Sequence, residues 1–122
     1  MAEPALKPVD LDHLNKYTGG DNTLNCQILG LFDRQCHEII EKLSHLAERD
    51  ESGDNAKNWR EVVHSLKGAA RGIGAFELGE IAAQAEKISL SNHREVLEAL
   101  QRLKTNAAHV HRFIDNLTNK ST

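Results

Sequence analysis

The sequence predicts an all-α protein, an antiparallel four-helix bundle with a short additional N-terminal helix. Hydrophobic residues recur at three- and four-residue spacing along most of the chain, which is the period of amphipathic helices. Prolines are scarce, since Pro4 and Pro8 are the only two and both lie near the N-terminus. Because 122 residues suffice for one core and the segments between the hydrophobic stretches are short, we expect neighbouring helices to be antiparallel.

The first helix is expected over residues 10–18. Asp10 can act as its N-cap, because a carboxylate accepts hydrogen bonds from the first free backbone N–H groups. Gly19 and Gly20 then end the helix, since glycine accepts the left-handed conformation. The whole chain is expected to divide into a flexible lead (1–8), the bundle domain (9–118) and a frayed C-terminal tail (119–122).

Asp21 is expected to cap the second helix, which runs to about Arg49. Gly30 interrupts this helix at a cost of about 1 kcal/mol relative to alanine. Its hydrophobic stripe consists of Leu24, Ile28, Leu31, Phe32, Cys36, Ile39, Leu43 and Leu46. A polar turn follows over residues 50–55.

Asp54 or Asn55 caps the third helix, and Gly72 and Gly74 mark its end. Its stripe consists of Trp59, Val62, Val63, Leu66, Ala70 and Ile73. A fourth helix is expected over about 75–88, with a stripe of Leu78, Ile81, Ala82, Ala85 and Ile88.

The fifth helix begins at Asn92 and Glu95, which have the spacing of a capping box. Its stripe consists of Val96, Leu100, Leu103, Ala107, Val110, Ile114 and Leu117. The regular alternation of four- and three-residue steps is typical of the seam of a helical bundle.

Composition excludes several classes of function. The formal net charge is −3, which argues against nucleic acid as the main partner. No apolar run approaches the roughly 18–20 residues of a membrane span, and the N-terminus lacks the apolar core of a signal peptide. Cys26 and Cys36 have neither disulfide nor metal-site spacing, and we interpret them as part-buried residues of a reducing cytoplasm.

His64 projects away from the hydrophobic stripe of the third helix. At about 100° per residue, it lies roughly opposite the centre of that stripe near Leu66. The same outer face carries Arg60, Lys67, Gly68 and Arg71. We therefore expect a solvent-exposed nucleophile surrounded by cations, with a glycine one turn further along.

This arrangement suits a histidine that carries a phosphoryl group. An imidazole with an ordinary pKa near 6.5 has an unprotonated nitrogen at neutral pH. Lys67 and Arg71 would favour the neutral ring by repulsion and would stabilise the phosphoryl group after its arrival. Gly68 would leave space for that group, although close helix packing or early fraying of the helix would also account for a glycine there.

The neighbours of His64 are needed for this interpretation, because seven histidines occur in the chain and an exposed helical histidine is usually only solvated. Lys67 and Arg71 could equally be ordinary charges of a solvated face. Arg60 and Glu61 fit a solvated face or the rim of a partner contact. A metal-binding bundle would need inward carboxylates and Glu-x-x-His pairs, which the sequence lacks.

The segment HSLKGAARGIG (64–74) resembles the signature of histidine-containing phosphotransfer domains, roughly H-x-L-K-G followed by an apolar residue and a glycine. The residues that match are His64, Leu66, Lys67, Gly68, Ile73 and Gly74. The entry segment 9–21 and the fourth helix are also similar, so the resemblance covers about residues 9–117. Arg71 and Gly72 depart from the small or polar residues that are frequent at these variable positions.

The resemblance implies a phosphorelay intermediary. His64 would accept a phosphoryl group from one receiver-domain aspartate and pass it to another, with Lys67 stabilising the phosphohistidine and Arg71 as a further phosphate contact. The implied partners are receiver domains of response regulators or of a hybrid histidine kinase, docking on Arg60, Glu61, Lys67, Gly68 and Arg71. Magnesium would sit on the receiver, and no cofactor, nucleotide or oligomer is expected. The alternative is an adaptor that binds a receiver without phosphotransfer.

Overall fold

The computed structural model describes residues 7–49 and 52–120, and these residues form five helices and no strand. The helices are α1 (Leu11–Thr18), α2 (Asn22–Ala47), α3 (Asn55–Ile73), α4 (Phe76–Glu86) and α5 (His93–Lys120). The all-helical class is therefore confirmed. Most of the predicted lead (1–8) and the last two residues of the predicted tail (119–122) lie outside the described residues.

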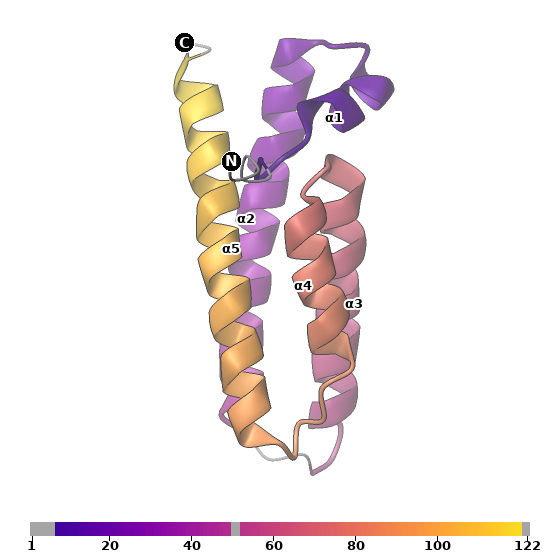
Figure 1. Ribbon diagram of the computed structural model, residues 1–122, viewed down its shortest axis with the longest axis vertical. Helices are drawn as coiled ribbons and strands as arrows, with labels where there is room; N and C mark the ends of the chain where they lie inside the picture. Colours follow the sequence, from indigo (N-terminus) through magenta and orange to yellow (C-terminus); the bar gives the residue numbers. More distant parts are fainter. Residues whose placement is uncertain (1–6, 50–51, 121–122) are drawn as a thin grey trace, which may run out of the picture.

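The helices α2, α3, α4 and α5 lie side by side along the long axis of the molecule, and each runs in the opposite direction to the one before it (Figure 1). α2 contacts α3 and α5, and α4 also contacts α3 and α5. The α3–α4 pair and the α2–α5 pair therefore form opposite sides of the molecule. α1 packs against α2 and α3.

Three of the predicted N-terminal capping residues, Asp10, Asp21 and Asn92, form the expected hydrogen bonds. Asp10 Oδ1 accepts hydrogen bonds from the N–H groups of Asp12 (3.1 Å) and His13 (3.3 Å). Asp21 and Asn92 cap α2 and α5 in the same way, through the N–H groups three residues further on. Asp54 precedes α3 but makes no side-chain cap hydrogen bond.

The predicted stripe of α3 forms the centre of the core. Trp59, Val63, Leu66 and Ala70 are all 0% exposed. The Trp59 indole also donates a hydrogen bond from Nε1 to the backbone oxygen of Ala85 (3.1 Å). This bond fixes the end of α4 beside the first half of α3, which matters for the site described below.

The predicted stripe of α2 is wrong at two positions, because Leu24 is 38% and Leu31 is 60% exposed. Asn25 is buried instead, where its Nδ2 donates to Asn15 Oδ1 (2.7 Å) and its Oδ1 accepts from Thr18 Oγ1 (2.6 Å). These bonds to α1 satisfy the amide and turn the Asn25 side of α2 inward. Leu24 and Leu31 therefore remain at the surface.

α1 is also tied to the end of α3. The N–H of Asp10 donates to the backbone oxygen of Gly74 (2.9 Å). Gly74 has φ +90, and a Cβ there would lie 2.6 Å from Asp10 O. Only glycine fits this close approach. Gly74 therefore ends α3 and also contacts the backbone of Asp10, the residue before α1.

Candidate functional site

His64 lies on the side of α3 that faces away from the core, as the sequence predicts. Its side chain is 65% exposed. Its Nδ1 is 2.7 Å from Oε1 of Glu86, the last residue of α4. A carboxylate only accepts hydrogen bonds, so this contact favours the tautomer with hydrogen on Nδ1 and a lone pair on Nε2.

Glu86 is shared by two residues of α3. Its second oxygen, Oε2, accepts a hydrogen bond of 2.7 Å from Lys67 Nζ. The Lys67 side chain is 21% exposed and that of Glu86 is 26% exposed. Lys67 is therefore not an ordinary charge of a solvated face, because its ammonium group is held between the two helices.

The sequence predicted cations around the His64 imidazole, but the structure also places a carboxylate next to it. The nearest ionic partner of His64 is a carboxylate, and the nearest cation is paired with that same carboxylate. The repulsion by Lys67 that the sequence suggested is therefore offset by Glu86. The pKa of the Glu86 carboxyl lies below its ordinary value of 4.5, because Lys67 and then His64 donate hydrogen bonds to its charged form.

The lowered pKa of Glu86 predicts a specific pH dependence of stability. A carboxyl whose pKa is lower in the folded state stabilises the protein fully above its ordinary value, 4.5 for Glu86. That stabilisation is lost as the pH falls through the folded-state pKa. We therefore expect the Glu86→Gln variant to be less stable than the wild type at neutral pH. The difference in their free energies of unfolding should shrink as the pH falls below about 4.5. Urea unfolding of both proteins at several pH values between 7 and about 3 measures this difference. A difference that stays the same at every pH would contradict the prediction.

Gly68 leaves open space one turn beyond His64. It is exposed, and a Cβ added there would meet no heavy atom within 4 Å outside its own helix backbone. Close helix packing therefore does not account for this glycine. Fraying does not account for it either, since α3 continues to Ile73.

Arg71 is not part of the His64 cluster. Its Nη2 is 3.9 Å from Glu80 Oε2, and its side chain is 48% exposed. The aliphatic part lies over Gly79 of α4, where a Cβ would be 2.8 Å from Arg71 Cγ. The arginine is thus directed toward Gly79 and Glu80 of α4, whereas Lys67 pairs with Glu86.

The predicted docking residues Arg60 and Glu61 are exposed on α3. Glu61 Oε1 lies 3.9 Å from Lys57 Nζ, a loose surface pair.

Glu86 is the functional candidate that sequence reasoning missed.

The described residues contain no group of three or more histidine, cysteine or acidic side chains that could hold a metal ion.

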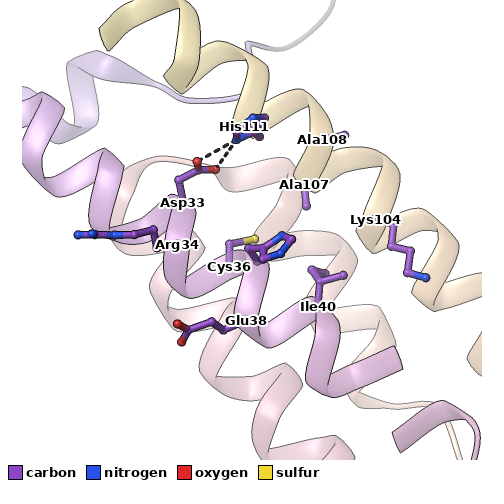
Figure 2. Close-up of a pocket in the computed structure, with 10 residues that line it drawn as sticks. Asp33, Arg34, Cys36, Glu38, Ile40, Lys104, Ala107, Ala108 and His111 are labelled. Atoms are coloured by element: carbon purple, nitrogen blue, oxygen red, sulfur yellow. Dashed lines mark hydrogen bonds and ion pairs between the residues drawn. The ribbon is translucent and has the colours of Figure 1, made fainter. Parts of the chain in front are cut away.

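A groove of about 580 Å³ lies between α2 and α5 (Figure 2), on the side of the molecule opposite the α3–α4 pair. His111 Nδ1 and Asp33 Oδ2 form an ion pair of 2.8 Å at this groove. Cys36 also lines the groove, and burial raises the pKa of its thiol to about 11, so it is not a reactive thiolate at neutral pH.

Comparison with protein families matches residues 27–118 to the Hpt domain. This match covers most of the chain, including α3 with His64 and α4 with Glu86, and the chain belongs to the Hpt domain family. Hpt domains act in phosphotransfer within two-component phosphorelays, where they interact with receiver domains. Comparison with curated proteins gave no match, and comparison with solved structures gave none either. None of the described helices is long and apolar enough to span a lipid bilayer.

Proposed function

We propose that this Hpt domain shuttles a phosphoryl group between receiver-domain aspartates, with Nε2 of His64 as the phosphoacceptor. The observation that carries the proposal is the contact of 2.7 Å between Glu86 Oε1 and Nδ1 of a histidine that is 65% exposed. This contact holds the ring by one nitrogen and leaves the other nitrogen as the nucleophile. A second residue that orients the imidazole in this way is a common device of histidine catalysis.

In the proposed reaction, the Nε2 lone pair attacks the phosphorus atom of an aspartyl phosphate. The N–P bond forms as the P–O bond to the aspartate breaks, and the aspartate carboxylate leaves with the bonding electron pair. The ring becomes positively charged while Nδ1 keeps its hydrogen, and Glu86 stabilises that charge across the Nδ1 hydrogen bond. Transfer to a second receiver is the same step in reverse.

The residues around His64 support docking of an acidic partner. α3 carries the cations Lys57, Arg60, Lys67 and Arg71, of which Lys57, Lys67 and Arg71 are paired with Glu61, Glu86 and Glu80. Four cations against three carboxylates leave a small positive excess among these residues, whereas the chain as a whole has a net charge of −3. A receiver site consists of carboxylates that hold magnesium, so local positive charge would steer and orient the encounter. In the proposal Lys67 contacts the phosphoryl group, Gly68 admits it, and Arg71, Arg60 and Glu61 contact the partner.

The exposed leucines of α2 extend this proposed surface. Leu24 and Leu31 lie seven residues apart, and at about 100° per residue they project on the flank opposite Asp33 and His37, which line the α2–α5 groove. α2 packs against both α1 and α3. Exposed apolar side chains are a common feature of protein contact surfaces.

The contacts between helices support the antiparallel four-helix bundle with an additional N-terminal helix that the proposal assumes. We propose that the domain works as a cytoplasmic monomer with receivers of response regulators or of a hybrid histidine kinase. It would need no cofactor of its own.

Labelling by phosphorylated receiver domains tests the proposal. We expect the protein to acquire a phosphate that is stable in base and labile in acid, as phosphohistidine is. A second, unphosphorylated receiver should then remove the label. Receiver binding without any label on this chain would instead support the adaptor alternative.

A further inference from the structure

One carboxylate serves both functional side chains of α3. Glu86 Oε1 is engaged by His64 Nδ1 and Glu86 Oε2 by Lys67 Nζ, each at 2.7 Å. His64 and Lys67 are the groups whose charges and hydrogen bonds act on Glu86, and Lys87 follows Glu86 directly in the chain, just beyond the end of α4. Before any phosphoryl group arrives, the ammonium group of Lys67 is therefore already paired.

A phosphoryl group on Nε2 would change this balance of charge. At neutral pH it carries a charge of about −1.5 to −2, whereas Glu86 carries a single negative charge. It would stand on the edge of the same five-membered ring whose Nδ1 contacts Glu86. The ammonium of a lysine is a compact point charge on a flexible stem, so Lys67 can reach a new partner without movement of α3.

We propose that Lys67 exchanges Glu86 for the phosphoryl group when His64 is phosphorylated, and returns to Glu86 when the phosphoryl group leaves. The inference rests on His64 as the phosphoacceptor and adds a change of partner at the same site. Glu86 thereby has two successive tasks. It holds Lys67 in the free domain, and in the phosphorylated domain its charge is directed to Nδ1–H of the phosphorylated ring.

The exchange has a consequence for docking. In the free domain Lys67 is only 21% exposed and lies against α4, so an incoming receiver meets a retracted lysine. In the phosphorylated domain the lysine is bound to the group that is to be transferred. The same residue thus presents a different surface to the donor receiver and to the acceptor receiver.

The test measures how fast the ammonium hydrogens of Lys67 exchange with water, by NMR of the ¹⁵N-labelled protein at neutral pH. Phosphoramidate serves as the phosphoryl donor, because it needs no partner protein. The N–P bond to His64 forms as the P–N bond of phosphoramidate breaks and ammonia leaves. The wild type and Glu86→Gln are each measured in the free and phosphorylated forms. Glutamine keeps an acceptor oxygen for Nδ1–H but removes the charge that holds Lys67.

In the free domain we expect Glu86→Gln to speed the exchange of the Lys67 ammonium hydrogens about tenfold, because their charged acceptor is lost. In the phosphorylated domain the same substitution should have less than about a twofold effect, because the phosphoryl group is then the acceptor. Lys87 provides the internal control, since its exchange should be the same in all four samples. An equal effect of Glu86→Gln in both forms would show that Lys67 stays on Glu86 and would overturn the inference. No receiver takes part, so this result is independent of the labelling test of the proposed function.

Discussion

Replacing His64 by glutamine is expected to abolish phosphoryl transfer completely. Glutamine retains a polar side chain of similar reach but has no nitrogen lone pair that can form a stable bond to phosphorus. His64 is 65% exposed and outside the core, so the fold and receiver binding should be preserved. Labelling by a phosphorylated receiver measures the transfer, and circular dichroism and a binding titration check the fold and the complex.

The chain offers a closely matched control for this experiment. His111 is 63% exposed, and its Nδ1 contacts a carboxylate oxygen of Asp33 at 2.8 Å, much as His64 contacts Glu86. It lies on the opposite side of the molecule and lacks both a paired lysine and a neighbouring glycine. His111→Gln should therefore retain full labelling. Label on the His64→Gln variant, or loss of label from His111→Gln, would refute the assignment of the phosphoacceptor.

The exposure of His64 could be predicted because it depends only on the helical period. The hydrophobic residues from Trp59 to Ile73 define the buried side of one helix, and His64 projects from the other side whichever helices pack there. The glycine at position 68 could be interpreted for the same reason. A single amphipathic helix thus contains most of the information about the predicted nucleophile.

Glu86 could not be predicted in this way, because its role depends on how two helices are aligned. The Trp59 indole donates to the backbone oxygen of Ala85, and this tertiary bond places the following residue beside His64 and Lys67. Nothing in the local pattern of the fourth helix marks Glu86 as different from Glu80, which pairs loosely with Arg71. The sequence therefore indicated the cations around the histidine but not the carboxylate that neutralises one of them.

The wrong assignment of Leu24 and Leu31 has a related cause. Both leucines satisfy an apolar three-four pattern, but the side of α2 that faces the core is centred on Leu29, Phe32, Cys36 and Leu43, with Asn25 on the same side. Asn25 has two hydrogen-bond partners in α1 and can therefore be buried. A pattern of hydrophobic residues does not reveal such partners, because they belong to another helix.

We expect Gly68 to lower the stability of α3 while keeping space open for the phosphoryl group beside His64. Since an added Cβ meets nothing within 4 Å, Gly68→Ala should stabilise the domain by about 1 kcal/mol through helix propensity alone. A larger side chain at this position would extend toward the space that the phosphoryl group and the receiver must enter. We expect Gly68→Leu to reduce the rate of transfer about 10²-fold, because small errors in the position of reacting groups have effects of this size.

Gly30 is the control that separates the effect of a glycine on helix stability from its effect on the rate of transfer. It also interrupts a helix, and a Cβ added there likewise meets nothing within 4 Å, but it lies on α2 rather than beside His64. Gly30→Ala should give a similar gain in urea stability, and Gly30→Leu should leave the rate of transfer unchanged. If Gly68→Leu transferred as fast as the wild type, open space at position 68 would have no role in transfer. A slow Gly68→Leu variant beside an unaffected Gly30→Leu variant would mean that α3 gives up helix stability at position 68 to keep the nucleophile accessible.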